Sequence, residues 1–154
     1  MKRNSLFGTF LLLAIIPSFV AAQNSANKRE VKTIAAIRAV LDAQSAAWNR
    51  GDVEGYMNGY ERSGATVLVS GDNVTRGWQT VLDRYKRNYN SREKMGTLTF
   101  SELEFNLIGS NTATVLGRWH LKRSSDEPHG RFTLIFKKTK QGWRIVHDHT
   151  SSAS

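Results

Sequence analysis

The feature that most constrains this chain is its last regular segment, residues 142–152, which reads Gly-Trp-Arg-Ile-Val-His-Asp-His-Thr-Ser-Ser. Its alternation of apolar and polar residues is typical of a strand, where successive side chains point to opposite faces of a sheet. Strict alternation places four side chains on one face: Trp143, Ile145, His147 and His149. We therefore predict a strand whose apolar end closes a pocket and whose imidazoles line it, with Asp148 pointing away.

The N-terminal residues have the order of a secretory signal peptide. A basic start, Met1-Lys2-Arg3, precedes an apolar run from Leu6 to Ile16 and the small residues Ala21 and Ala22. The run is too short to span a bilayer comfortably, and a small-residue exit is typical of cleavage. We predict a signal peptide at residues 1–22, cleaved after Ala22, and a secreted or periplasmic protein. The alternative is a retained membrane anchor.

Composition excludes several classes of function. The chain has no cysteine, so an exported domain must be held by packing without disulfides. The formal net charge is +9, but the basic residues are scattered and their densest group, at residues 137–140, lies at a predicted hairpin. We interpret this charge as solvated surface. We expect no nucleic-acid partner and, once the signal is removed, no membrane partner.

Helical periodicity predicts three helices, and most of the predicted strands follow the third helix in the sequence. Residues 23–29 are expected to form a flexible leader, followed by a helix over residues 30–49 with Trp48 on its apolar stripe. Gln44 lies on the same stripe, where it could bond a neighbouring loop or face a cavity. Asp52 caps a second, shorter helix, in which Tyr56 and Tyr60 lie on the same face.

A third helix follows Gly77 and carries Trp78 and Tyr85 at helical spacing. Strands are predicted over residues 65–70, 74–76, 97–108, 112–122 and 131–139, before the last one. The apolar phase of residues 97–108 changes midway, which a strand allows only with an extra residue. We therefore predict a bulge near Ser101-Glu102.

This order of helices and strands predicts an α+β fold, a strongly bent antiparallel sheet around helices. Four motifs then resemble the nuclear transport factor 2-like superfamily and its SnoaL-like group: Ala47 to Asp52, Ala65 to Val67, Arg76-Gly77, and Gly142 to Ser151. The resemblance covers residues 30–152. The last motif resembles the end of the association domain of calmodulin-dependent protein kinase II. The resemblance implies a cone-shaped domain with a pocket at its open end, paired as a homodimer through the outer face of the sheet.

The group also includes ketosteroid isomerase, whose proton transfer needs a carboxylate base on the first strand and a phenol from the first helix. The matching positions here are near Val69 and Gln44, and neither side chain can do that chemistry. The sequence therefore disfavours a steroid-isomerase mechanism. It leaves open which other chemistry, if any, the pocket performs.

The candidate pocket combines an aromatic wall with a few polar groups, the usual composition of a small-molecule site. Its predicted members are Gln44, Trp48, Tyr56, Tyr60, Val67, Trp78, Tyr85, Trp119, Thr133 and His149. The catalytic candidates are His147 as acid or base and Arg131 as an anion-binding group. The alternative is that both histidines satisfy backbone or dimer contacts.

Three functions remain open at this point. The first is binding of a small, partly apolar molecule, neutral or anionic. The second is an isomerase, dehydratase or cyclase that uses His147 with Arg131. The third is a homo-oligomeric assembly module whose pocket is filled by its own side chains. We expect no cofactor and no metal site, because His147 and His149 have no third ligand placed by spacing.

Overall fold

The computed structural model describes residues 16–153. The chain divides into two compact units, one ending at Lys32 and one beginning at Thr33, and helix α1 (Ile16–Asn49) contributes to both. Within the described residues, no helix is long and apolar enough to cross a membrane. Most of the predicted signal peptide, residues 1–15, lies outside the described part, so its cleavage stays a prediction.

The first helix begins earlier than the sequence predicts. Residues 23–29, expected to be flexible, are helical within α1. The reason is that no glycine or proline interrupts residues 18–49, while Pro17 lies in the first turn, where a missing N–H is tolerated. The predicted start of this helix at residue 30 is therefore wrong. The division of the chain into leader and domain stays a prediction.

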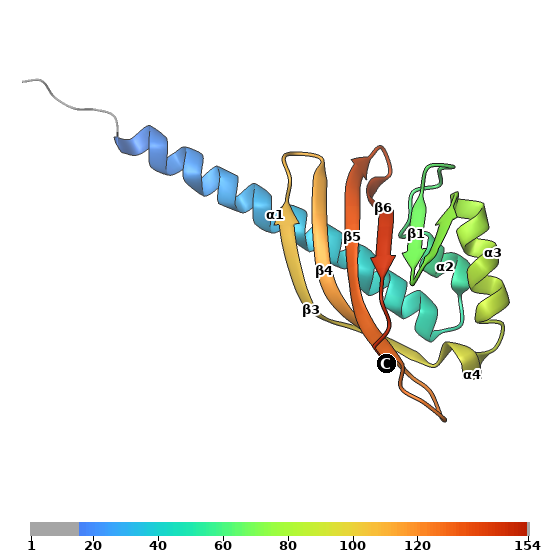
Figure 1. Ribbon diagram of the computed structural model, residues 1–154. Helices are drawn as coiled ribbons and strands as arrows, with labels where there is room; N and C mark the ends of the chain where they lie inside the picture. The colour runs from blue at the N-terminus through green and yellow to red at the C-terminus, as the bar shows by residue number, and fades with distance from the viewer. Residues whose placement is uncertain (1–15, 154) are drawn as a thin grey trace, which may run out of the picture. The chain divides into compact units, whose positions relative to one another are not determined.

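The α+β class is confirmed, with helices packed against a curved, unclosed sheet (Figure 1). The other helices are α2 (Val53–Met57), α3 (Trp78–Asn88) and the short α4 (Arg92–Met95). The strands are β1 (Val67–Ser70), β2 (Asn73–Arg76), β3 (Thr97–Leu107), β4 (Thr112–Lys122), β5 (His129–Thr139) and β6 (Gly142–Thr150). As expected, the Asp52 carboxylate caps α2 by accepting the Gly55 N–H.

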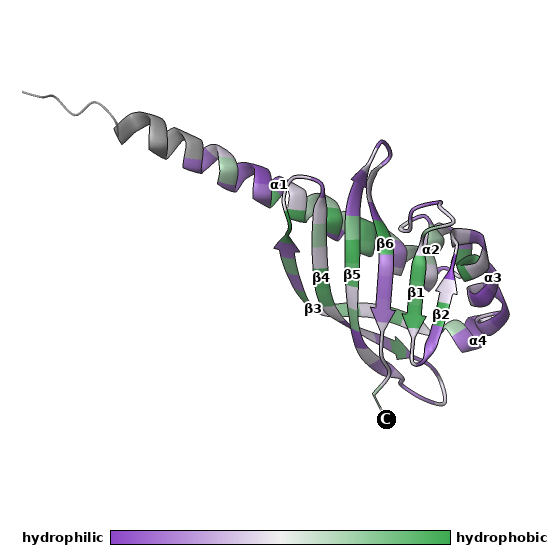
Figure 2. Cartoon of the chain, turned by 45° about the horizontal axis from the view of Figure 1, so that its top comes forward, coloured by the Kyte–Doolittle hydropathy of each residue, from purple (hydrophilic) through white to green (hydrophobic). Residues whose placement is uncertain are grey.

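The six strands form one sheet in the order β2-β1-β6-β5-β4-β3. Neighbouring strands are antiparallel except β1 and β6, which run parallel, so the sheet is not uniformly antiparallel as the sequence predicts. The parallel pair brings the first strand of the domain beside the last. Figure 2 shows β1 as largely hydrophobic and β6 as hydrophilic in its second half.

Two bulges interrupt the sheet. The predicted bulge in β3 is confirmed: the register shifts between Ser101 and Glu104, and Glu102 has a φ of +51°. A second shift, which the sequence analysis did not predict, lies between β5 and β6. There Ile135 pairs with His147 while Phe136 pairs with Ile145, so Val146 is the extra residue. Each bulge reverses which residues of its strand face inward.

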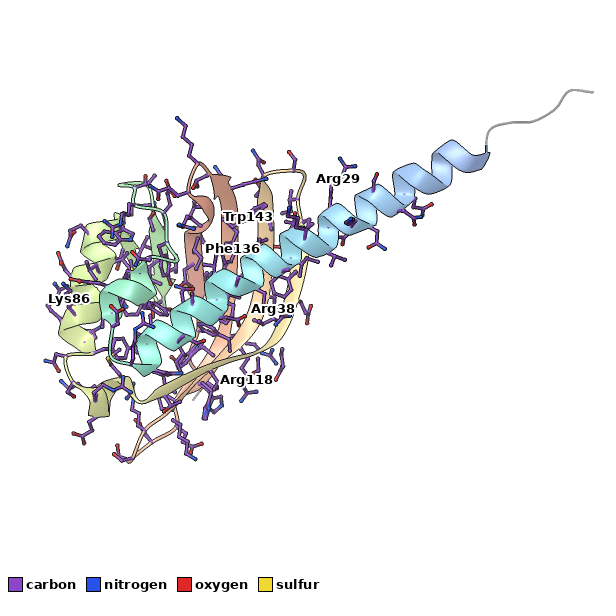
Figure 3. The ribbon with its side chains drawn as sticks, turned by 180° about the vertical axis from the view of Figure 1, so that it is seen from behind. Arg29, Arg38, Lys86, Arg118, Phe136 and Trp143 are labelled. Carbon is purple, nitrogen blue, oxygen red and sulfur yellow. The ribbon has the colours of Figure 1, made fainter. Side chains whose placement is uncertain are left out.

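The core lies between the sheet and the part of α1 within the second unit. Figure 3 shows this side of the sheet, with α1 passing across it and Phe136 and Trp143 labelled. Ile37 and Leu41 of α1 are buried with Phe136 in one apolar cluster. At its C-terminal end, α1 is tied to β3 by Asn49, whose side chain donates to the Leu98 carbonyl and accepts the Leu98 N–H.

Candidate ligand-binding site

A cavity opens between the C-terminal half of α1, the helices α2 and α3, and the inner face of the sheet. The centre of a water molecule can occupy about 140 Å³ of it. Of its twenty lining side chains, thirteen are aromatic or aliphatic and seven are polar or charged. The lining residues are Gln44, Trp48, Tyr56, Tyr60, Leu68, Ser70, Arg84, Tyr85, Asn88, Tyr89, Leu98, Phe100, Trp119, Leu121, Phe132, Leu134, Ile145, Asp148, Thr150 and Ser152.

The helical side of the wall is an aromatic cluster around Trp48. Its ring centroid lies 5.1 Å from Tyr56, 6.0 Å from Tyr85 and 4.7 Å from Tyr89, all in edge-to-face geometry. The indole Nε1 of Trp48 donates to the Met95 carbonyl at 2.9 Å, so the ring is fixed in place. Such rings bury large apolar areas while their hydroxyls remain available to polar partners.

A carboxylate lies in the sheet side of the wall. Asp148 of β6 is only 5% exposed, and its Oδ2 accepts a hydrogen bond from the Tyr60 hydroxyl at 2.6 Å. Its other oxygen, Oδ1, is buried too, and no donor within residues 16–153 bonds to it. A buried acceptor without a donor is costly, so this oxygen calls for a hydrogen-bond donor that the described residues do not supply.

Burial perturbs the titration of these groups. Burial raises the pKa of Asp148 to about 6, and the hydrogen bond from Tyr60 opposes that rise. Burial, and next the neighbouring Asp148 carboxylate, raises the pKa of Tyr60 and of Tyr56. Burial also raises the pKa of Tyr85, followed by the effect of Tyr56. The phenols therefore stay protonated near neutral pH, while Asp148 can exchange its proton there.

A family model described as the SnoaL-like domain matches residues 37–154. The chain belongs to this family. A solved NTF-2-like protein of unknown function from Shewanella oneidensis is 39% identical to this SnoaL-like chain, with a TM-score of 0.74, over 77% of this chain and 98% of the other. The resemblance to the nuclear transport factor 2-like superfamily is thus confirmed.

More distant structures share the fold alone. A ketosteroid isomerase-like protein from Erwinia carotovora is 18% identical with a TM-score of 0.63, over 78% of this chain and 95% of the other. A candidate scytalone dehydratase from Novosphingobium aromaticivorans is 8% identical with a TM-score of 0.71, over 83% and 89%. Among curated proteins, the comparison finds no match.

Six of the predicted pocket residues line the cavity of this SnoaL-like domain: Gln44, Trp48, Tyr56, Tyr60, Tyr85 and Trp119. Gln44 combines both roles considered for it, because it lines the cavity while its Nε2 donates to the Tyr56 carbonyl at 3.0 Å. Trp119 is held at the wall by a 2.9 Å hydrogen bond from its Nε1 to the Ser151 carbonyl. Their contact with a ligand stays a prediction.

The prediction that His147 and His149 face the cavity is wrong. The bulge at Val146 reverses the phase of β6, so Trp143 and Ile145 remain inside but Asp148 replaces the imidazoles as the inward group. His147 then shares a row with Val67, and His149 with Thr133. These rows belong to the outer face of the sheet.

The other predicted polar groups lie on the outer face as well. Phe132 and Leu134 of β5 point into the cavity, so the alternate residues Arg131 and Thr133 point outward. The Arg131 guanidinium forms an ion pair with Glu102 at 2.6 Å. Arg131 therefore does not line the cavity and cannot act there with His147. Val67 is also outside, because Leu68 and Ser70 are the inward residues of β1.

Trp78 is not part of the cavity wall either. Its Nε1 donates to the Met57 carbonyl at 2.9 Å, and the Arg62 guanidinium lies over its ring at 4.5 Å from the centroid. The indole therefore joins α3 to α2 instead of contacting a ligand. Helical spacing predicts that Trp78 and Tyr85 lie on the same face of α3. It does not predict that Tyr85 borders the cavity while Trp78, two turns earlier, lies outside it.

Sequence reasoning missed the polar groups Asp148, Arg84 and Asn88. The sequence carries no local signal for Asp148, because strict alternation after Ile145 places His147 on the inward face and Asp148 on the outward one. Arg84 and Asn88 are one helical turn apart on α3, and helical spacing alone gives no reason to place polar residues of that helix in a pocket. Within the described residues, no group of three His, Asp or Glu side chains is placed to hold a metal ion.

Proposed function

We propose that this SnoaL-like domain binds a small, largely apolar molecule in the aromatic cavity and holds a hydrogen-bond donor of that molecule against Asp148. The observation that carries the proposal is Asp148, which lines the cavity and whose buried Oδ1 accepts no hydrogen bond from the described residues. A ligand hydroxyl or N–H would satisfy it, while aromatic rings would cover the apolar remainder.

The proposal replaces the pair expected from the sequence. His147 and Arg131 lie on the outer face and do not border the cavity, so a ligand inside it would not touch them. Asp148 and Tyr60 take their place, because they are bonded to one another and lie in the wall. The assembly-module hypothesis in its filled-pocket form is disfavoured, since the cavity can hold solvent-sized molecules.

The test is to identify what the cavity retains. The purified protein and an Asp148→Asn variant are compared by native mass spectrometry for co-purifying small molecules, and then by calorimetric titration with any molecule found. We expect about tenfold weaker binding for Asp148→Asn, because a charge-assisted hydrogen bond is lost. The exposed change Asp72→Asn, at the turn between β1 and β2, is the matched control. Equal affinities for all three proteins would contradict the proposal.

Catalysis is the second candidate, and the titration of Asp148 favours it. A carboxylate with a pKa of about 6 is basic enough to remove an activated C–H proton and acidic enough to return it. This would move the isomerase or dehydratase hypothesis from His147 to Asp148, with Tyr60 positioning the carboxylate. Deuterium exchange from solvent into a bound carbonyl compound tests it, and exchange that persists in Asp148→Asn would refute it.

We further propose that the domain pairs as a homodimer through the outer face of the sheet. Leu116 is 40% exposed there, in a row with Thr133 and His149. An apolar side chain among short polar ones can lie against a second sheet. Light scattering after size exclusion is the measurement. A Leu116→Glu variant is expected to be monomeric at concentrations where the parent is dimeric, and a monomeric parent would contradict the assignment.

Export stays part of the proposal. The support is the order of basic, apolar and small residues before residue 23. The intact mass of the protein recovered from the periplasm or medium of a bacterial host tests it. A mass that corresponds to residues 23–154 is expected, and a full-length mass in the cell pellet would contradict export.

A further inference from the structure

We infer that the ligand of this cavity carries a carboxylate, bound at the cavity mouth by Arg84, and that it spans one aromatic ring between this carboxylate and the donor group held by Asp148. The inference rests on the proposed function, because it concerns the same cavity. It adds the chemical class of the ligand and its orientation.

Arg84 is a cation at the cavity wall, and one hydrogen bond within residues 16–153 engages its guanidinium. Its side chain is half-buried and lines the cavity, and its Nη1 donates to Thr75 Oγ1 at 2.8 Å. A guanidinium has five N–H donors in a planar fork, so a single hydroxyl contact leaves the rest available. Among the described residues, no carboxylate forms an ion pair with Arg84.

Neighbouring basic residues on α3 differ from Arg84 in this respect. Lys86 is exposed and pairs with Glu54, and Arg87 is exposed and does not line the cavity. Asn88, one turn after Arg84, is exposed and also lines the cavity, and the i, i+4 spacing places both side chains on the same face of α3. The mouth of the cavity is therefore the place where α3 presents a positive charge and a neutral donor together.

The sheet register gives the scale of the ligand. Thr75 of β2 pairs with Leu68 of β1, and Leu68 pairs with Asp148 of β6, so the anchor of Arg84 and the deep carboxylate occupy one row. Two interstrand spacings of about 4.8 Å separate their backbones by roughly 10 Å. The Arg84 guanidinium, hydrogen-bonded to Thr75, is therefore on the order of 10 Å from Asp148, a separation that one ring with a donor at one end and a carboxylate at the other can bridge.

The two charges also fix the direction of the ligand. A ligand carboxylate would be repelled by ionised Asp148 if it entered first, and it would be attracted by Arg84 if it remained at the mouth. The planar fork of arginine matches the two oxygens of a carboxylate. The donor end therefore enters the cavity, and the anionic end stays near solvent.

The probe pair is 4-hydroxyphenylacetate and its neutral amide, 4-hydroxyphenylacetamide, titrated into the full chain at neutral pH with chemical shifts of backbone amides as readout. We expect the acid to bind about tenfold more tightly than the amide. Arg84→Gln should abolish this preference, so that the acid and the amide bind with equal affinity. Arg87→Gln, a matched change on the exposed side of the same helix, should keep it.

The outcomes separate the inference from the proposed function. If the acid and the amide bind equally to the parent protein, the carboxylate inference is wrong while ligand binding in the cavity stands. If Arg84→Gln retains the preference, another group recognises the anion and the role of Arg84 is wrong. If neither probe shifts the amides of cavity residues, both the inference and the proposed function fail for ligands of one ring.

Discussion

The buried carboxylate gives a prediction about stability that does not require a ligand. Burial raises the pKa of Asp148 from its ordinary value of 3.8 to about 6 in the folded chain. Below about pH 4 the side chain is protonated in both the folded and unfolded states, and burial then carries no charge penalty. Between pH 4 and 6 the unfolded chain releases this proton first. The stability present at low pH is lost as pH rises through 6.

The size of the effect follows from the two values. Each pH unit corresponds to 1.36 kcal/mol, so a rise from 3.8 to about 6 costs about 3 kcal/mol by pH 7. Asparagine keeps the acceptor for the Tyr60 hydroxyl but has no proton to release. Its amide nitrogen adds a cost of about 1–3 kcal/mol if it is left without a partner, but that cost does not change with pH.

The assay is urea unfolding of the parent chain and Asp148→Asn from pH 4 to pH 7. We expect the free energy of unfolding of Asp148→Asn, relative to the parent, to rise by up to about 3 kcal/mol over this range. Asp72→Asn, which is exposed, controls for the loss of a carboxylate as such. A difference between Asp148→Asn and the parent that stays constant with pH would refute the assignment of Asp148 as the buried titrating group.

Three further changes test the packing, the bulge and the outer face. Trp48→Phe should cost about 1–3 kcal/mol more in urea unfolding than Trp143→Phe, because it alone strands the buried carbonyl of Met95; equal costs would contradict that account. Glu102→Gly should be about 1 kcal/mol more stable than Glu102→Ala, because both lose the same exposed ion pairs but only glycine relaxes the positive φ; the usual order for strands, alanine above glycine, would show that the bulge carries no strain. His147→Ala should leave the affinity of any cavity ligand unchanged, as calorimetry can show, whereas weaker binding would return the histidine to the site.

Much of the fold follows from local patterns in the sequence. The phase change from Phe100 to Leu103 could only be accommodated by an extra residue, and the structure has its bulge there. The cap at Asp52 and the helix after Gly77 also depend on residues close in sequence. Such features are predictable because the interactions that produce them act within a few residues.

The polar part of the site could not be predicted in the same way. Its position depends on the register of β6 against β5, which packing of the whole sheet decides. Arg84 depends on how α3 is rotated over the cavity, because the same spacing fits a solvated face. The aromatic wall was easier, since Trp48 and Tyr56 are large and apolar enough to be buried in any arrangement of these helices.

The sign of the net charge does not predict the charge at the bottom of the cavity, and this contrast limits what composition can say. The formal net charge is +9, yet the charged side chain buried in the cavity wall is a carboxylate. An excess of surface charge attracts anions to the protein in general. Only Arg84 at the mouth together with Asp148 inside would orient a bound anion. A molecule that is negatively charged throughout would be attracted by Arg84 and repelled by ionised Asp148. Selectivity for a polar end and an anionic end, a ring apart, therefore follows from the site and not from the net charge.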